Sequence, residues 1–520
     1  MLSSPHLRAL IVLIVLAMTT MLVMRWLLKG TELYESFERR RTVWLAATLI
    51  SFGIPSFYLA MVMLGALYLW AQRRDPQPIG LYLMCLLAVP PISRDLEGFG
   101  PINALFSINN FRLLSLTILL PLAWRLFTTP KPKGAQPPAG PRLPDIAVVM
   151  YVVYLLLLYL PHESITQIMR RGLHMSLDLL LPYFVVTRWL KTRADVKDAL
   201  AALLVTAIFL APISLFEHFK GWLLWGTAAE WWGVPNHFLS LYVFRDASLR
   251  ATVSSGHPLV WGHYLVVCFG LLTLFRVQFK RFRLVVVWAL LSLAMYSTVS
   301  RSPWLAAALV VLLMGLFTGR AIRFYALVTT TAAIGSAAAL ASPWSEKFIN
   351  LLPFIGKTDS ETIDYREQIL ETAIMMVQQK PLFGDVHVLE NLEHLRQGQG
   401  IIDLVNVYAE MAMTFGLIGL GLFLTFLLSA LGHGLALCWR SRKKDREMFL
   451  MTGAASLGLI GSMVLLVAIS NYLSVPLVYT ALAATLVVMV RLGKQPVPTT
   501  ATDMPLKPSG PSASRAVVMR

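Results

Sequence analysis

Three arginines, Arg250, Arg301 and Arg366, come from three separate segments of a chain of 520 residues. Arg301 lies within "TVSRSPWLAAAL" (298–309), between two apolar runs with few residues in which to turn. A charge deep in a bilayer costs roughly 2.5–3.5 kcal/mol on insertion scales, so such a residue usually faces a cavity or a partner. Guanidinium groups stay charged and bind phosphate through two parallel N–H groups. Three of them from separate segments predict a site that neutralises a diphosphate without a metal.

Each arginine also has an ordinary structural explanation, which stays open at this point. Arg301 could be a snorkelling side chain at a helix end, Arg250 an interfacial arginine and Arg366 a solvated charge. The surroundings of Arg250 favour the binding interpretation, because a helix is expected to begin near His257 and Pro258. A helix N-terminus offers N–H groups and the positive end of its dipole, and both suit an anion.

Two carboxylates, Asp403 and Glu410, lie in "GQGIIDLVNVYAEMAMTFGLIGLGLF" (398–423), together with Asn406 and Tyr408. A carboxylate beside a diphosphate can take the proton from an attacking hydroxyl group. A continuous helix would place the two acids on one face, because they are two helical turns apart. The alternative is that they only complement the positive end of a helix dipole.

Two histidines, His257 and His387, are further candidates for accepting that proton. His257 fits a hydrogen bond at the start of the expected helix better than the base of a nucleophile. Ser254 and Ser255 precede it and would fit a serine hydrolase, but no matching base motif lies on another helix.

No metal or cofactor is expected. The histidines at positions 162, 387 and 394 match no metal-binding spacing, and HExxH is absent. The three cysteines lie in or at the ends of apolar runs and include no CxxC pair. Neither a P-loop nor a GxGxxG motif stands in a strand–helix context, so nucleotide chemistry is unsupported.

The composition places the chain among polytopic membrane proteins. It is 57% hydrophobic and 14% charged, whereas soluble domains carry about 25% charged residues. We predict an all-α membrane protein with roughly 12–15 transmembrane helices of about 20 residues each and a partly helical external loop between late spans. The expected spans are 8–28, 43–70, 79–92, 109–127, 145–161, 172–190, 199–217, 257–275, 284–299, 304–318, 325–342, 411–438, 449–470 and 475–490. The interruption "SFGIPSF" (51–57) makes 43–70 either one kinked helix or a tight hairpin.

The net charge of +17 comes largely from short loops between the expected spans. The basic loops fall on one side of the membrane, and they are 440–447, 319–324, 276–283 and 191–198, joined by the linker 128–142. The positive-inside rule makes that side the cytoplasm. No basic soluble domain exists, which argues against binding of nucleic acid.

Two long loops, 218–256 and 343–410, remain on the external side, so we expect the protein to act there. The sequence of the loop 343–410 predicts an amphipathic helix that begins with a capping box at Thr358 and Glu361 and ends before Pro381. The tryptophans of the first loop, at 222, 225, 231 and 232, fit an interfacial aromatic belt or a platform for sugar rings.

The expected organisation has five regions. They are the N-terminal transmembrane helices (1–200), the central helices with the first external loop (201–342), the loop with the amphipathic helix (343–410), the C-terminal helices (411–491) and a disordered cytoplasmic tail (492–520) that is rich in Pro, Ser and Thr.

Four segments in sequence resemble the bacterial O-antigen ligase and polysaccharide polymerase superfamily. They are "LRATVSSGHPL" (249–259), "SRSPWLAAAL" (300–309), "YREQILETAIMMVQQKPLFGD" (365–385) and "NVYAEMAMTFGLIGL" (406–420). Their order and spacing agree with that superfamily over about residues 245–425, whereas the first 200 residues match only as generic spans.

The resemblance implies an inner-membrane glycosyltransferase that uses glycan units on undecaprenyl diphosphate at the periplasmic face, without a metal or cofactor. It implies that Arg250, Arg301 and Arg366 hold the diphosphate and that Asn406 and Tyr408 position the acceptor. Ligases commonly carry His-Asn where this chain has Val405-Asn406. That departure favours a polymerase of exopolysaccharide or O-antigen and leaves the base open among Asp403, Glu410, His257 and His387.

Three alternatives stay open. The protein could ligate the glycan to a lipid or another acceptor, or it could be a transporter or flippase of lipid-linked sugars, or a scaffold of a secretion complex. A flippase is expected to show broken helices and internal repeats, and we find no repeat. Partners that fit the favoured role are the lipid-linked oligosaccharide, membrane lipids, a chain-length regulator and a flippase, with no nucleic acid.

Overall fold

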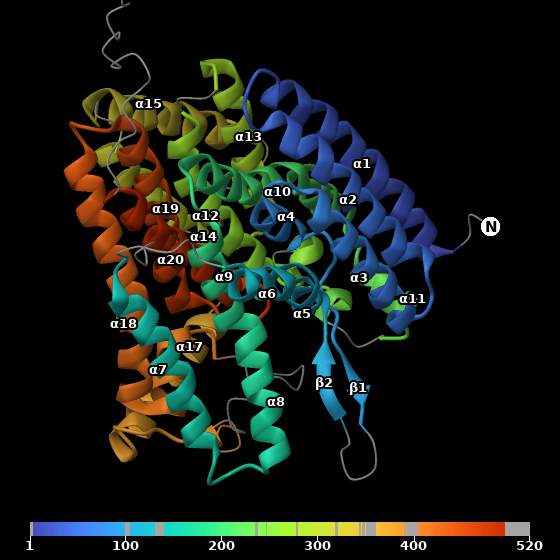
Figure 1. Cartoon of the computed structure of the whole chain (residues 1–520). Helices are drawn as coiled ribbons and strands as arrows, with labels where there is room; N and C mark the ends of the chain where they lie inside the picture. The colour runs from blue at the N-terminus through green and yellow to red at the C-terminus, as the bar shows by residue number, and fades with distance from the viewer. Residues whose placement is uncertain are drawn as a thin grey trace, which may run out of the picture.

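The structure is a computed structural model, and its fold is almost entirely helical, as expected from the sequence (Figure 1). The residues that it describes are 4–98, 104–130, 140–234, 238–245, 247–276, 279–317, 321–342, 345, 349, 360–388, 390, 392 and 404–494.

The helices follow one another along the chain with few strands between them. In chain order they are α1 (Pro5–Leu28), α2 (Tyr34–Gly53), α3 (Phe57–Arg74), α4 (Pro78–Cys85), α5 (Asn110–Leu114), α6 (Leu120–Thr128), α7 (Arg142–Tyr159), α8 (Ile165–Met175), α9 (Leu181–Trp189), α10 (Arg193–Lys220), α11 (Gly226–Trp231), α12 (Pro258–Phe275), α13 (Arg281–Ser297), α14 (Arg301–Met314), α15 (Ala321–Leu340), α17 (Ser360–Gln379), α18 (Val407–Ser441), α19 (Arg446–Leu465) and α20 (Val475–Leu492). Two π-helical turns, η1 (Ser115–Leu119) and η2 (Ser176–Leu180), join α5 to α6 and α8 to α9. Two antiparallel hairpins pair β1 (Arg94–Glu97) with β2 (Ala104–Ile108) and β3 (Phe244–Arg245) with β4 (Ser248–Leu249).

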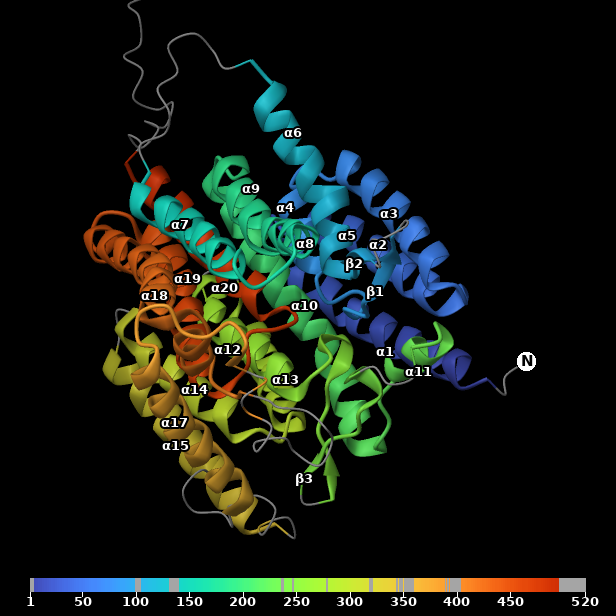
Figure 2. The same ribbon diagram turned by 90° about the horizontal axis from the view of Figure 1, so that it is seen from below.

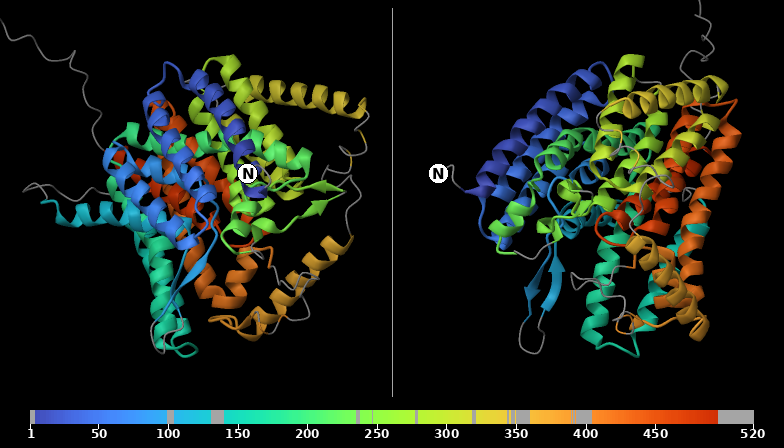
Figure 3. Two further views of the ribbon diagram at one scale, coloured as in Figure 1. Left: turned by 90° about the vertical axis from the view of Figure 1, so that its right-hand side faces the viewer. Right: turned by 180° about the vertical axis from the view of Figure 1, so that it is seen from behind.

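Eight of the described helices are long and apolar enough to cross a membrane, judged by length and composition. They are Pro5–Leu28, Asn110–Thr128, Arg142–Tyr159, Arg193–Lys220, Pro258–Phe275, Val407–Ser441, Arg446–Ala468 and Val475–Leu492. The sequence predicted more spans because several other apolar runs form helices that are shorter or more polar, and Arg301–Phe317 is one of the shorter ones. α15 touches the bundle near its start and then extends away from it (Figure 3).

The expected span 79–92 is wrong as a full membrane helix. α4 has eight residues, about 12 Å at 1.5 Å per residue, and the apolar run then continues without regular structure. Asn110 Nδ2 donates to the carbonyl oxygens of Cys85 and Val89 at 3.2 and 3.1 Å. Irregular backbone at membrane depth is tolerated where protein buries it, and this whole run is buried.

The ambiguous run 43–70 forms a hairpin. α2 ends at Gly53, and α3 begins at Phe57 after a three-residue turn that contains Pro55. Ser56 caps α3 by accepting a hydrogen bond from the backbone N–H of Leu59. A serine N-cap and a proline before it are standard signals for a new helix start.

The turns that join the helices gather at two ends of the bundle. At one end, Arg193 pairs with Asp445 at 2.6 Å, and Arg283 donates to the carbonyl oxygen of Lys29 at 3.0 Å. We call this the basic end, and it comprises the turns after α1, before α10, before α13 and between α18 and α19. Three of the four expected basic loops therefore lie together.

The opposite end, here called the site end, comprises the described residues of 221–257, the turn 298–300, the segment 466–474 and α17. Trp231 stacks on His6 with ring centroids 3.8 Å apart, so the start of α1 also lies there. Trp225 and Trp232 are buried, and Trp232 Nε1 donates to a backbone carbonyl. These two tryptophans are core residues, so the expected aromatic belt is wrong for them.

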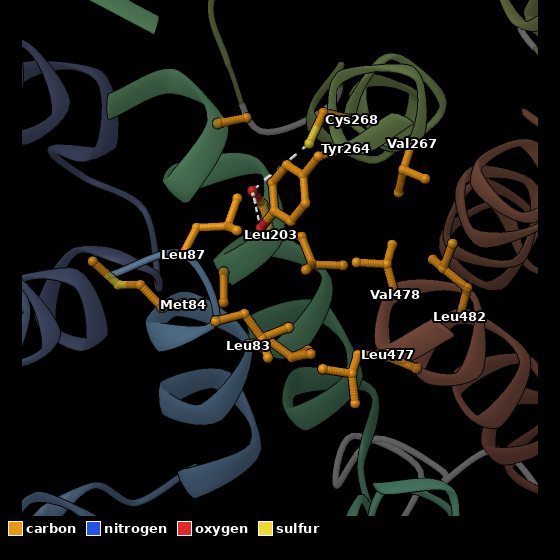
Figure 4. Packing of buried hydrophobic residues seen from close by; sticks show 14 of the residues in the cluster. Leu83, Met84, Leu87, Leu203, Tyr264, Val267, Cys268, Leu477, Val478 and Leu482 are labelled. Atoms are coloured by element: carbon orange, nitrogen blue, oxygen red, sulfur yellow. Dashed lines mark hydrogen bonds between the residues drawn. The ribbon is translucent and has the colours of Figure 1, made fainter. Parts of the chain in front are cut away.

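α12 is the central helix of the bundle, because all of its residues are buried. Glycines let its neighbours approach closely, as in many membrane helix pairs. A Cβ on Gly262 would lie 2.5 Å from Pro303 Cγ of α14, and one on Gly270 would lie 2.5 Å from Gly458 N of α19. Figure 4 shows α12 packed through Tyr264 and Cys268 on Leu203 of α10.

A buried charge network joins three segments near the basic end. Arg40 is 3% exposed and pairs with Asp75 at 2.7 Å and with Asp198 at 2.6 Å. The sequence gives no sign of this network, because Asp75 and Asp198 are distant from Arg40 along the chain. A buried charge without its partners is strongly destabilising, so this network fixes α2 against α10.

Helix α17 confirms the helix expected within 343–410, although Thr358 of its expected capping box lies outside the described residues. One face packs through Ile369 and Ala373 in a small apolar cluster with Met413 of α18. The opposite face, including Leu370, is exposed. The helix ends at Gln379, just before Pro381, as expected.

The segment after α17 fills a break in α18. Gly416 has φ +65° and interrupts the helix. Its loop partner Gly384 approaches so closely that a Cβ there would lie 2.5 Å from Gly416 N. Leu417 N donates to Pro381 O at 2.8 Å, and Asp385 N donates to Met413 O at 2.8 Å. The backbone N–H and carbonyl groups that lose their helical partners at the break thus form hydrogen bonds with the "PLFGD" segment (381–385).

We expect Gly416→Ala to destabilise the protein strongly. The left-handed backbone alone costs an alanine about 1–3 kcal/mol, and the new Cβ would overlap the backbone of Leu382. Thermal unfolding of the detergent-purified protein measures the loss. The matched control is Gly421→Ala, because Gly421 lies on the same helix with open space around its Cα. Equal stability of the two variants would contradict the interpretation.

Candidate functional site

The turn between α13 and α14 is the point around which the expected site is built. Val299 has φ +46°, an unfavourable conformation for a β-branched residue that persists only where the surroundings enforce it. Ser300 is the residue before α14, and Arg301 is the first residue of that helix. The chain therefore turns in three residues and presents Arg301 at the site end.

Two guanidinium groups hold this turn. Arg250 Nη2 donates to Ser300 Oγ at 2.6 Å, and its Nε donates to Thr298 O at 3.3 Å. Arg245 Nη1 donates to Val299 O at 3.3 Å. Arg250 and Arg301, which are separated by fifty positions in the sequence, are thereby brought to the same turn.

Arg366 of α17 joins this group through its charge. Desolvation lowers the pKa of Arg366, and the positive charge of Arg245 lowers it further. Burial likewise lowers the pKa of Arg250, with additional effects from Arg245 and Arg366. These three guanidinium groups are close enough to repel one another. Arg245, Arg250 and Arg366 are therefore near one another at the site end, and Arg301 directly follows the turn that Arg250 binds.

His257 lies beside Arg250 and caps α12. Its Nδ1 accepts a hydrogen bond from the backbone N–H of Leu259 at 3.3 Å, and burial together with Arg250 lowers its pKa to about 3. The ring is therefore neutral, and the hydrogen bond assigns the proton to Nε2. Tyr472 contacts the ring with centroids 5.9 Å apart. The expected helix start at His257 and Pro258 is confirmed.

The serines beside His257 are used by the fold. Ser254 Oγ donates to Leu87 O at 2.5 Å, and Ser255 Oγ donates to Thr252 O at 2.6 Å. Both side chains are fully buried. They hold the loop before α12 in place, so the structure adds no support for a serine hydrolase.

Glu217, at the end of α10, fixes the same loop. Its side chain is fully buried and accepts hydrogen bonds from the backbone N–H groups of Leu224, Thr252 and Val253 at 3.1, 3.2 and 2.8 Å. Val253 has φ +46°. A buried carboxylate with three such donors is well satisfied, and it imposes the strained backbone that follows Arg250.

Asn406, Val407 and Tyr408 form the start of helix α18. Asn406 Oδ1 accepts hydrogen bonds from the backbone N–H groups of Tyr408 and Ala409 at 3.0 and 3.1 Å, and Tyr408 Oη donates to Met463 O at 2.7 Å. Because α18 begins only at Val407, no continuous helix unites positions 403 and 410. Asp403 itself lies outside the described residues.

The remaining candidate bases have other surroundings. Glu410 is half-buried in the first turn of α18, and its charge acts on tyrosines of α7 and α20. His387 contacts the ring of His162 at 5.4 Å and pairs with Glu390 at 3.0 Å. Arg250 is close enough to His257 for its charge to lower the pKa of the ring.

Arg245, Tyr472 and Glu217 were missed by the sequence analysis. Arg245 stands five positions before Arg250 in the same external loop, and that spacing was the available signal. No sequence signal marked Tyr472 or Glu217, because their neighbours in the structure come from distant segments of the chain.

Comparison with known proteins gives one family. No curated protein sequence matches the chain. The O-antigen ligase family matches residues 285–424, a stretch that contains Arg301, Arg366 and Asn406 but begins after Arg250 and His257. It spans α13, α14, α15, α17 and the first half of α18. The chain, a multi-pass membrane protein by the length and hydropathy of its helices, is similar to the O-antigen ligase family over residues 285–424.

Proposed function

We propose that the protein transfers a glycan from a polyprenyl diphosphate to a sugar hydroxyl group and thereby polymerises lipid-linked oligosaccharide units. The observation that carries the proposal is the convergence of Arg250, Arg301 and Arg366 at one end of the bundle. The family match supports a lipid-linked glycan as substrate. Undecaprenyl diphosphate is the carrier that the resemblance implies.

The reaction breaks the bond between the anomeric carbon and the diphosphate oxygen. The bonding electron pair leaves with that oxygen, and the acceptor hydroxyl oxygen forms the new bond to the anomeric carbon. The hydroxyl proton passes to a base. Negative charge therefore grows on the diphosphate as the bond breaks, and preorganised positive groups that face this charge lower the barrier.

The arginine cluster suits this task because its charges are held in place before substrate binds. Hydrogen bonds to the turn 298–300 fix Arg245 and Arg250. Mutual repulsion disfavours the charged forms of Arg250 and Arg366, so an anion that binds beside them would relieve an electrostatic cost. Donors that need no rearrangement act more strongly than mobile side chains.

The proposed location is the bacterial inner membrane, with the site end toward the periplasm. The gathering of basic turns at the opposite end supports this orientation through the positive-inside rule. A lipid-linked unit flipped to the periplasmic side would then meet the arginines. A flippase and a chain-length regulator are the protein partners that such a role requires.

The alternative acceptor is a lipid or another molecule, as in a ligase. Val405 stands where ligases commonly have histidine, and this departure favours the polymerase. A flippase role receives less support, since the backbone of the loop after α17 binds the broken turn of helix α18.

We expect Arg301→Lys to abolish most transfer while the protein still inserts and folds. Lysine keeps the charge but loses the two-pronged geometry of guanidinium, and loss of one preorganised donor costs about 10²–10³-fold in rate. The assay is reconstitution with a lipid-linked repeat unit, with polymer and released diphosphate lipid as readouts. Arg94→Lys is the control, because Arg94 lies on β1 and donates to Gly233 O rather than to the turn 298–300. Unchanged polymer length and yield in Arg301→Lys would refute the role.

We expect His257→Asn to keep most of the activity. Asparagine is a strong N-cap and replaces the acceptor that His257 Nδ1 provides to Leu259. The rate measured over a range of pH in the same assay tests this. A loss of about 10²–10⁴-fold, the usual contribution of a general base, would instead assign the proton transfer to His257. His257→Ala, which removes the cap as well, gives the stability reference.

A further inference from the structure

Arg245 belongs to the same site and has no role from the sequence analysis. It is half-buried, and its Nη1 donates to the carbonyl oxygen of Val299 at 3.3 Å. Arg250 donates to the residues on either side of Val299. Two guanidinium groups therefore bind three consecutive residues of one turn, immediately before Arg301.

The β3–β4 hairpin fixes the position of Arg245. Arg245 pairs with Ser248, and Phe244 pairs with Leu249, which is buried. The backbone N–H of Arg250 donates to Val243 O at 3.0 Å, so the hairpin extends to the second arginine. Both side chains thus start from one short, hydrogen-bonded element. Figure 2 shows this hairpin projecting from the same side of the bundle as α17.

Arg245 is the neighbouring charge with the largest effect on the two other arginines. After burial, its charge is the main cause that lowers the pKa of Arg250. After desolvation, its charge also lowers the pKa of Arg366. Arg245 is therefore near the loop arginine and near the arginine of α17 at once. With Arg301 on the adjoining turn, the site has four guanidinium groups.

We propose that Arg245 is a fourth anion-binding residue of this site, and that it binds the released polyprenyl diphosphate more strongly than the glycan-bearing donor. The proposal rests on the function proposed above. The geometry that supports it is the shared turn before Arg301. Arg245 binds Val299 of this turn, and Arg250 binds the next residue, Ser300.

The charge of the substrate explains why a fourth cation is useful. In the donor the diphosphate is esterified at both ends and carries two negative charges. After transfer, one end is a free phosphate, whose second ionisation lies near pH 6, so the product carries a third charge at neutral pH. Interactions that are stronger with the developing product than with the donor accelerate the chemical step. Arg245 therefore contributes more to raising kcat than to lowering KM.

The experiment compares wild type, Arg245→Gln and Arg245→Lys in the full-length protein in detergent. Equilibrium binding of undecaprenyl diphosphate is measured from pH 5 to pH 8, beside binding of the lipid-linked repeat unit. Transfer kinetics are measured in the same preparations. Arg94→Gln is the matched control, because it removes a positive charge that contacts Gly233 O and the ring of Tyr58 instead of the turn 298–300.

We expect wild type to bind undecaprenyl diphosphate more tightly as the pH rises through 6, and Arg245→Gln to lose this gain. The glutamine variant should bind the product about 10- to 100-fold more weakly, as for loss of a hydrogen bond to a charged group, with kcat reduced and KM nearly unchanged. Arg245→Lys should keep the pH-dependent gain, since it keeps the charge. A role confined to holding the turn would weaken both ligands equally at every pH, and that result overturns the proposal.

The two proposals fail in different ways. If wild type binds undecaprenyl diphosphate and transfers glycan, but Arg245→Gln matches it in both assays, Arg245 has no anion-binding role and the glycosyltransferase stands. If wild type neither binds the diphosphate lipid nor transfers glycan, the glycosyltransferase proposal fails, and the role of Arg245 fails with it.

Discussion

Repulsion among guanidinium groups is the constraint on which the site end depends. Arg245, Arg250 and Arg366 are close enough to disfavour one another's charged forms, and the fold nevertheless holds them together. Arg245 and Arg250 are held by hydrogen bonds to a turn whose central residue, Val299, is in an unfavourable conformation. Strain and like-charge repulsion at one place are hard to explain by stability alone. Both become useful when a multiply charged anion occupies the site.

The supporting structure explains why the cluster can persist. A buried carboxylate, Glu217, holds the loop after Arg250 through three backbone N–H groups. Gly262 lets α14 approach α12 closely through Pro303. This contact helps to position Arg301, which lies two residues before Pro303. On the other side, the loop after α17 is locked into the break of α18 at Gly416. Segments far apart in sequence are thus fixed relative to one another without any large soluble domain among the described residues.

Much of this could be predicted from the sequence, and the reasons are physical. Apolar runs and few charges require a helical membrane protein, since lipid satisfies no backbone group. The arginines could be found because a permanent charge between apolar runs is costly and therefore informative. The helix start at His257 and the helix before Pro381 followed from local signals. Each of these features depends on neighbours in the chain.

The features that the sequence analysis missed depend on distant partners. The run 79–92 is apolar enough for a span, yet Asn110 allows it to unwind by binding its carbonyl groups. Arg40 resembles its neighbours in a basic stretch, and only Asp75 and Asp198 make it a buried network. Trp225 and Trp232 resemble an interfacial belt and are core residues instead. The "PLFGD" and "GLIGL" motifs could be recognised, but their mutual contact could not.

An experimental structure of the protein with undecaprenyl diphosphate bound decides whether the arginines form a diphosphate site. The expected result is a diphosphate at the site end, with its oxygens within about 2.7–3.2 Å of guanidinium nitrogens of Arg250, Arg301 and Arg366. A diphosphate bound elsewhere, or guanidinium groups that turn away from it, would contradict the proposed glycosyl transfer at this site.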